Sequence, residues 1–277
     1  MYVSFSGGKD STVLLDLVRR IFPDCPAVYV DTGLEYPEIR EFVQSIPNVT
    51  ILKPEKNFKQ VVLEYGYPLI SKEVSQKIYE YRRNPNGCLK DRFDANSEYN
   101  QKYKGRYSMA KWVWLRDSDI PISHKCCDIM KKKPAKLYEK QTGMHPIIAT
   151  MACESRLRET KWLQTGCNSF DSKRPNSNPM SFWTEQDVLH YLYRFKIPYA
   201  SVYGDIKMDE QGRYYTTGCD RTGCMFCGFG CHLEKEPNRF QRMKQTHPSV
   251  WEWCMKDIED GGLGMRPVLD YIGVKVE

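Results

Sequence analysis

The sequence predicts an α/β protein built on a doubly wound parallel sheet, and three observations carry this prediction. Strand-like and helix-like segments alternate over residues 2–65. A glycine-rich turn joins the first apolar segment to the first helical one. The apolar strand pattern returns at residues 145–150. Strands that alternate with helices pair in parallel, and helices cover the two faces of the resulting sheet.

The first elements follow in a regular order. An apolar strand is expected at residues 2–5, and strands are also expected at residues 27–30 and 49–52. A helix over residues 38–46 is opened by Pro37, whose missing N–H costs nothing in a first turn. Apolar residues at helical spacing predict the helix between the first two strands: Val13, Leu14, Leu17, Val18 and Ile21.

The later elements are less regular. Helices are expected at residues 58–65 and at 185–195, the latter capped by Thr184, and two helical turns near residues 248–258. The polar residues 169–178 predict a loop.

Composition and charge restrict the class of protein. The chain has 277 residues, of which 41% are hydrophobic and 27% charged, as in globular proteins. No apolar run approaches the ~20 residues that a membrane span needs, and the N-terminus has no signal-peptide pattern. We therefore expect a cytoplasmic protein without membrane contact.

Positive charge is concentrated in one segment. The whole chain carries +6, whereas residues 72–140 hold 17 basic and 9 acidic residues, a local charge of +8. Tyrosines and tryptophans are interspersed with the basic residues, which suits either a nucleic-acid surface or an ordinary helical subdomain. An anionic partner is expected, with nucleic acid or a small molecule as the acceptor.

These patterns predict three parts. Residues 1–71 and 121–217 form a nucleotide-binding α/β domain. Residues 72–120 form a basic, aromatic helical insertion, and residues 218–277 form a cysteine-rich metal-binding segment with C-terminal helices.

The glycine loop, defined as residues 6–11, is the first motif that carries chemistry. Its sequence is Ser-Gly-Gly-Lys-Asp-Ser, between a strand and a helix. Gly7 and Gly8 allow a tight turn and a close approach of backbone to ligand. Backbone N–H groups and the helix N-terminus favour an anion there, and Ser6 and Ser11 can donate hydrogen bonds to it. Lys9 adds a mobile positive charge, and Asp10 is suited to holding Mg²⁺.

Cysteines form the second candidate site. There are eleven, a high number for a reducing compartment, which favours metal ligands or reactive thiols over disulfides. Cys219, Cys224 and Cys227 have the C-x4-C-x2-C spacing of iron–sulfur ligands, with Cys231 close behind. Iron is expected, with zinc as the alternative. The dispersed cysteines are expected to be small buried side chains: Cys25, Cys88, Cys153, Cys167 and Cys254.

The glycine loop resembles the signature of the PP-loop ATP pyrophosphatase superfamily. Val30 to Glu38 is similar to the second motif of one branch, the phosphoadenosine and adenosine phosphosulfate reductase family. Further similarities follow in order, at Cys126-Cys127, at Glu154 to Arg158, and at Gly223 to Cys227. The resemblance implies a PP-loop fold of the HUP type and a nucleotide-binding enzyme.

The resemblance also implies ligands. The second motif, Asp31-Thr32-Gly33, lies at the end of the strand beside the glycine loop, where open parallel sheets bind nucleotides. Its backbone would read adenine, and Arg158 would reach the phosphates. Resemblance to the adenosine phosphosulfate reductases implies a [4Fe-4S] cluster on Cys126, Cys127, Cys224 and Cys227, with Cys219 as a competitor of Cys127.

One departure from the family pattern separates the functional hypotheses. Sulfonucleotide reductases resembling this family carry a nucleophilic cysteine in a short Glu-Cys-Gly-[Leu or Ile]-His tail, and residues 261–277 contain no cysteine. The first hypothesis is therefore a PP-loop enzyme that binds ATP and Mg²⁺, cleaves at the α-phosphate and serves sulfur transfer from a sulfur donor, as in tRNA thiolation or DNA phosphorothioation. The alternatives are a sulfonucleotide reductase that uses a thioredoxin-like reductant, and a zinc-stapled nucleic-acid-binding module.

Overall fold

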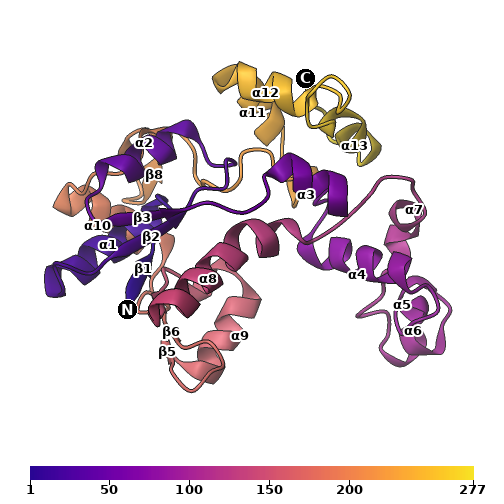
Figure 1. Ribbon diagram of the computed structural model, residues 1–277, viewed down its shortest axis with the longest axis horizontal. Coiled ribbons are helices and arrows are strands. Elements are labelled where there is room, and N and C mark those ends of the chain that lie inside the picture. Colours follow the sequence, from indigo (N-terminus) through magenta and orange to yellow (C-terminus); the bar gives the residue numbers. More distant parts are fainter. The chain divides into compact units, whose positions relative to one another are not determined.

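The computed structural model describes all 277 residues, which divide into two compact units (Figure 1). Unit 1 comprises Met1–Glu55 and Lys131–Cys224, and unit 2 comprises Lys56–Met130 and Met225–Glu277. The three-part division drawn from the sequence remains a prediction.

Unit 1 contains a six-stranded sheet with the order β3-β2-β1-β4-β6-β5. The strands are β1 (Tyr2–Ser4), β2 (Ala27–Val30), β3 (Val49–Leu52), β4 (Pro146–Ile147), β5 (Asn168–Ser169) and β6 (Asn176–Ser177). All neighbouring strands pair in parallel except β5 and β6, which are antiparallel. The predicted α/β class with a mostly parallel sheet is confirmed.

Helices lie on both faces of this sheet. Val3 of β1 packs in one core with α1 (Lys9–Ile21), α2 (Pro37–Ser45) and α10 (Glu185–Phe195). The neighbouring residue, Tyr2, packs its ring edge-on against Tyr138 of α8 (Lys133–Thr142), with 5.3 Å between ring centroids. Successive strand residues point to opposite faces, so α8 covers the face opposite α1. The sheet is therefore doubly wound.

The α8 face of the sheet carries a partly buried ion pair. Glu139 accepts a 2.7 Å hydrogen bond from the Tyr2 hydroxyl and two from the Arg174 guanidinium, at 2.6 and 2.7 Å. Burial alone would raise the pKa of Glu139, but these hydrogen bonds outweigh burial and lower the pKa below its usual value. Since the folded-state pKa is depressed, the carboxylate stabilises the fold at neutral pH and loses this effect on acidification.

Glu139→Gln is expected to reduce the free energy of unfolding at pH 7 by about 1 to 2 kcal/mol, because Arg174 is partly solvent-screened. Urea unfolding from pH 7 down to pH 3 measures the effect. The difference between wild type and variant should shrink below the usual glutamate pKa and should vanish once Glu139 is protonated. A difference that does not change with pH would contradict the assignment.

The remaining elements of unit 1 surround the sheet. They are α9 (Arg156–Thr165), a β7–β8 hairpin (Ile206–Met208 and Tyr214–Thr216), and short 3-10 turns at Ala152–Glu154 and Ser201–Tyr203. Thr184 caps α10 through a hydrogen bond to Asp187 N–H, as predicted. The expected loop at residues 169–178 is wrong at its ends, because β5 and β6 are two-residue polar strands that give no apolar alternation.

Unit 2 is helical. Its helices are α3 (Phe58–Tyr65), α4 (Lys72–Arg83), α5 (Lys90–Phe93), α6 (Glu98–Lys102), α7 (Val113–Arg116), α11 (Arg239–Thr246), α12 (Pro248–Met255) and α13 (Met265–Tyr271), with 3-10 turns at Ala110–Trp112 and Cys231–Leu233. A π-helix spans Asp128–Lys132 at the boundary of the two units.

The two chain segments of unit 2 are joined by specific contacts. The Tyr67 hydroxyl donates a 2.9 Å hydrogen bond to Leu263 O, and a parallel bridge links Ile70 to Phe229. Phe226 packs between Phe58 and Trp253, with ring centroids 5.6 Å from each. The C-terminal residues therefore complete the core of the helical unit. None of the helices in the structure has the length and apolar character required to cross a membrane.

Candidate functional site

The glycine loop lies between β1 and α1, at the carboxyl end of the central strand of unit 1 (Figure 1). Gly7 has φ +71°, a backbone conformation that costs free energy in residues other than glycine. A Cβ at Gly7 would also lie 2.7 Å from Ile39 and 2.8 Å from Val43 of α2. The loop therefore packs against α2, and only glycine fits at this position.

The two serines close the loop upon itself. Ser6 N–H donates to Ser11 Oγ at 3.1 Å, and the two hydroxyl oxygens lie 3.0 Å apart. Ser11 Oγ also donates to Gly8 O at 3.0 Å. Helix α1 begins after Gly8, which offers no capping side chain. The first turn of α1 thus presents backbone N–H groups and the positive end of its dipole beside a fixed loop.

Lys9 is buried at this helix end, with 4% of its surface exposed. Its ammonium lies 3.3 Å from the Asp10 carboxylate and 3.1 Å from that of Glu185, the first residue of α10. Burial by itself would lower the pKa of Lys9, but the carboxylates of Asp10 and then Glu185 outweigh it and raise the pKa above its ordinary value. Lys9 therefore stays protonated at neutral pH.

Tyr203 ties the loop to the segment that carries the first cysteines. Its hydroxyl accepts a 3.1 Å hydrogen bond from Lys9 N–H and lies 2.6 Å from Thr222 Oγ1. The backbone continues this connection, since Cys219 N–H donates to Val202 O at 2.9 Å. Residues 219–224 of unit 1 therefore lie beside the start of α1.

The second motif forms a turn at the end of β2. Asp31 accepts a hydrogen bond from Gly33 N–H at 3.1 Å and pairs with Arg40 at 3.3 Å. Gly33 has φ +80°. The Thr32 hydroxyl and N–H both donate to the Glu35 carboxylate, at 2.8 and 3.1 Å. The side chains of Asp31 and Thr32 thus hold the turn, as Asx-type turn residues do.

Arg158 belongs to the same unit and forms an ion pair with Glu154. Glu154 also lies 3.9 Å from Arg221. Burial, and then the positive charge of Arg221, lower the pKa of Arg158 below its ordinary value, while Asp10 acts in the opposite direction.

The cysteines of the predicted metal site are divided between the units. Cys219 and Cys224 belong to unit 1, whereas Cys126, Cys127 and Cys227 belong to unit 2. The sulfurs of Cys126 and Cys127 lie 3.9 Å apart. Within either unit taken alone, no group of three or more cysteine, histidine, aspartate or glutamate side chains gathers as a metal site.

Several other cysteines have different surroundings. Cys231 donates to Gly228 O at 3.1 Å, and burial raises the pKa of its thiol to about 11. Cys254 is fully buried, as expected, and burial raises its pKa as well. The expectation of burial is wrong for Cys88 and Cys153, which are exposed. The residues around Cys88 and Cys153 show no regular hydrophobic periodicity, so the sequence gives no signal of their exposure.

A protein-family model described as the phosphoadenosine phosphosulfate reductase domain matches residues 1–81 and 71–228, which is most of the chain. The chain belongs to this family. The resemblance inferred from the glycine loop and the second motif is therefore confirmed.

Proteins of similar sequence include archaeal and bacterial ones. An uncharacterized protein of Methanocaldococcus jannaschii is 25% identical over 90% of this chain and 39% of its own length, and a second from the same organism is 24% identical over 90% and 45%. The chain thus spans less than half the length of these two relatives. An adenosine 5'-phosphosulfate reductase of Geobacillus kaustophilus is 24% identical over 70% of this chain and 63% of its own.

Among solved structures, a phosphoadenylyl-sulfate reductase from Candida auris, crystallised as a phosphate complex, aligns with a TM-score of 0.41 and 15% identity. The alignment covers 76% of this chain and 82% of that one.

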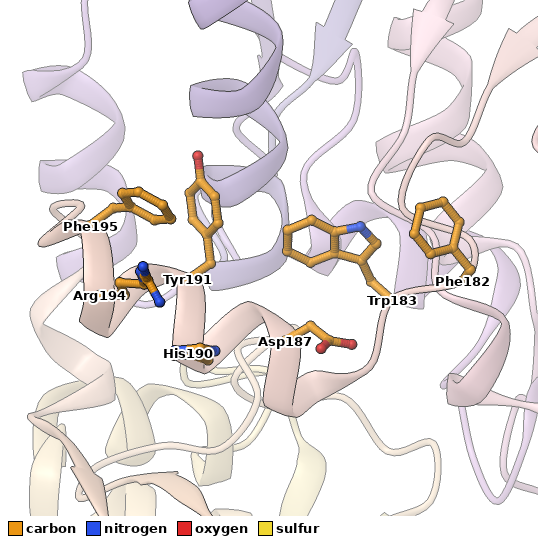
Figure 2. Close-up of a pocket in the computed structure, with 7 residues that line it drawn as sticks. All are labelled: Phe182, Trp183, Asp187, His190, Tyr191, Arg194 and Phe195. Atoms are coloured by element: carbon orange, nitrogen blue, oxygen red, sulfur yellow. The ribbon is translucent and has the colours of Figure 1, made fainter.

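A cavity of 390 Å³ on α10 is separate from the glycine loop of this family member. Figure 2 shows its aromatic lining, with Phe182 and Trp183 before α10 and Tyr191 and Phe195 along it. Tyr191 donates a 2.6 Å hydrogen bond to Asp16 of α1, so part of this lining serves the packing of α10 on α1. None of the site residues predicted from the sequence lines the cavity.

Three residues of the site were not predicted from the sequence. Glu185 pairs with Lys9, and Tyr203 and Thr222 hold the first turn of α1. Each lies more than 170 residues from the loop in sequence, so no local spacing could connect them. The one available signal was Glu185 in the first turn of a capped helix, a position that suits an acidic residue without any partner.

Proposed function

We propose that unit 1 binds an adenine nucleotide with its phosphates over the glycine loop and cleaves it at the α-phosphate, activating an acceptor for sulfur transfer. The observation that carries the proposal is Lys9. A buried, protonated ammonium at a helix N-terminus is a site for anionic oxygens, and its present partners are carboxylates that a phosphate can replace.

The proposed chemistry follows from these groups. An acceptor oxygen forms a bond to the α-phosphorus, and the α–β bond breaks with its electron pair leaving on pyrophosphate. A sulfide nucleophile then displaces AMP and forms the carbon–sulfur bond. Lys9 stabilises charge on the departing phosphates, and the first-turn N–H groups of α1 orient them. Asp10 would hold Mg²⁺, which neutralises phosphate charge.

Other predicted site residues take supporting roles in this proposal. The backbone of Asp31, Thr32 and Gly33 reads the adenine edge, while their side chains keep the turn in shape. Arg158 reaches phosphate oxygens by exchanging Glu154 for them.

The donors at the predicted metal centre are cysteine thiols. Thiols are the right ligands for iron–sulfur clusters and for zinc, and the 3.9 Å between the Cys126 and Cys127 sulfurs fits two corners of a tetrahedral zinc site. Bonds of 2.3 Å would place two such corners about 3.8 Å apart. The [4Fe-4S] assignment to Cys126, Cys127, Cys224 and Cys227, with Cys219 as competitor, rests on the family resemblance. The assigned ligands are divided between the two units, so no step is derived through the metal.

Sulfonucleotide reduction is the second candidate, because curated relatives are named adenosine or phosphoadenosine 5'-phosphosulfate reductases. Here the same loop would hold a phosphosulfate, and a thiol would attack sulfur before a thioredoxin-like reductant releases sulfite. Cys254 is the one cysteine after Cys231 in these 277 residues, and its complete burial argues against it as that nucleophile.

The two candidates differ in their products. Protein prepared without oxygen is incubated with Mg²⁺ and ATP plus acceptors and sulfide, or with adenosine phosphosulfate and thioredoxin. The proposal expects AMP and pyrophosphate from ATP, dependent on the acceptor. Sulfite from the phosphosulfate without ATP cleavage would replace the proposal with the reductase, and loss of that sulfite in Cys254→Ser would identify the thiol. No product from either nucleotide would overturn both.

A further inference from the structure

Unit 2 presents a surface rich in tyrosine and positive charge around α6. This tyrosine loop, defined as residues 99–107, contains Lys102, Lys104 and Arg106, and no acidic residue occurs anywhere in residues 99–116. Tyr103 and Tyr107 are 41% and 40% exposed. All three cations of the loop are exposed as well.

The tyrosine rings form a continuous row. The ring centroids of Tyr99 and Tyr103 are 4.8 Å apart, and those of Tyr103 and Tyr107 are 5.6 Å apart. The cations lie over these rings, with Lys102 above Tyr103 at 5.7 Å and Arg106 above Tyr107 at 5.5 Å. Lys102, Lys104 and Arg106 form no ion pair with a carboxylate in the structure. The charges are therefore available to an external anion.

The backbone of the loop is fixed rather than free to collapse. Asn100 is buried, and its side-chain amide donates to the carbonyls of Asp91, Arg92 and Asp94 at 2.9, 3.2 and 2.7 Å. Gly105 N–H donates to Asn100 O at 2.8 Å. These bonds join the loop to α5, and Figure 1 shows α5 and α6 side by side. The rings and charges are thus held in place before any partner binds.

Two nearby arginines, Arg82 and Arg116, bind groups of the protein itself. The Arg82 guanidinium donates to the carbonyls of Leu115, Ser118 and Ile120 at 3.0, 2.6 and 2.6 Å, and Arg116 pairs with Asp117 at 2.7 Å. Arg82 thus joins α4 to residues 115–120, and the charge of Arg116 is paired within its own segment. Surplus charge that can meet a partner is therefore present on the tyrosine loop, with Lys111 beyond it.

We propose that the tyrosine loop binds single-stranded nucleic acid. Cations in alternation with exposed aromatic faces match a chain that alternates phosphates with unpaired bases, because the phosphates meet the charges and the bases stack on the rings. A duplex would offer its phosphates but not its base faces. As an assignment of the acceptor, this inference rests on the proposed function, whereas the binding itself does not depend on nucleotide turnover.

Fluorescence anisotropy of the full chain with labelled 20-nucleotide RNA and DNA strands tests the inference, in the absence of ATP. Lys102→Glu/Lys104→Glu/Arg106→Glu should weaken binding at least 10-fold and reduce the slope of log affinity against log salt by about 2. Tyr103→Ala/Tyr107→Ala should weaken binding by at least about 30-fold, because each stacked base is worth about 1 to 3 kcal/mol, with the salt slope unchanged. RNA and DNA measured side by side identify the preferred strand.

The control carries the same change of net charge on unit 1, with Lys140→Glu, Lys173→Glu and Lys207→Glu at exposed positions. It should bind as wild type does. Circular dichroism of each variant verifies folding. Equal loss in the control, equal affinity for duplex, full competition by polyglutamate, or no binding at low salt would each overturn the inference. Strand binding without ATP cleavage would leave the inference intact and refute the proposed function. ATP cleavage without strand binding would support the proposed function and overturn the inference.

Discussion

Lys9→Ala is expected to weaken adenine-nucleotide binding by about 10- to 100-fold and to reduce turnover by at least that factor, because one buried charge-assisted contact is worth about 1.5 to 3 kcal/mol. The ammonium is the one cation held at the start of α1 between Asp10 and Glu185, and its raised pKa keeps it charged. Removal of the ammonium also leaves two carboxylates facing the incoming phosphates. Calorimetric titration with a non-hydrolysable ATP analogue and with adenosine phosphosulfate measures the loss.

Lys140→Ala is the matched control for this prediction. It removes an exposed lysine from α8 of the same unit and should bind nucleotide as wild type does. Lys9→Met keeps most of the side-chain volume without the charge, so it separates loss of charge from loss of packing. Wild-type affinity in Lys9→Met would show that the phosphates do not meet this ammonium.

Gly7→Ala is expected to destabilise unit 1 by roughly 2 to 4 kcal/mol and to abolish nucleotide binding, through a positive-φ penalty and an overpacking penalty. The new methyl group would lie 2.7 Å from Ile39 and 2.8 Å from Val43, so the loop must move away from α2. Denaturant unfolding gives the loss of stability, and nucleotide titration gives the loss of binding.

Two glycine variants separate the causes. Gly143 also has a positive φ, +68°, but a Cβ there meets no atom within 4 Å, so Gly143→Ala should cost only the conformational penalty of about 1 kcal/mol. Gly8 has an ordinary φ, and its Cβ would lie 3.2 Å from Ser6 Oγ, so Gly8→Ala should be milder than Gly7→Ala. If Gly7→Ala were no more destabilising than Gly143→Ala, the contact with α2 would not constrain the loop.

The sheet and its nucleotide-binding edge were predictable because their signals are local. Strand β2 and helix α3 have the ranges expected from apolar runs, and α10 begins after the predicted cap Thr184. The glycine loop could be placed at a strand–helix junction because glycines and a following amphipathic helix are adjacent in sequence. Tyr2 and Val3 could be assigned to a strand, but nothing local shows that Tyr2 meets Glu139.

Long-range partners were not predictable, for a physical reason. Whether Lys9 is a mobile charge or a buried one depends on Glu185, and that depends on how α10 packs against α1. The sequence does not show what the Asp31 carboxylate contacts, and only the folded backbone shows it accepting a hydrogen bond from Gly33 N–H. The charge of the insertion was visible in sequence, but the division between Arg82, which binds carbonyls, and the open tyrosine loop was not.

The Tyr203 hydroxyl has a consequence for regulation. It touches the first N–H of α1 on one side and Thr222, between two cysteines, on the other. A movement of Thr222 would shift the Tyr203 hydroxyl and, with it, the backbone N–H groups at the start of α1 that face a bound anion. A bound anion that holds these N–H groups in place would in turn oppose the movement of Thr222. Energetic coupling between two sites is reciprocal. A ligand bound at Cys219 or Cys224 would therefore change the affinity of the glycine loop for an anion, and an anion on the loop would change the affinity of the cysteines by the same factor.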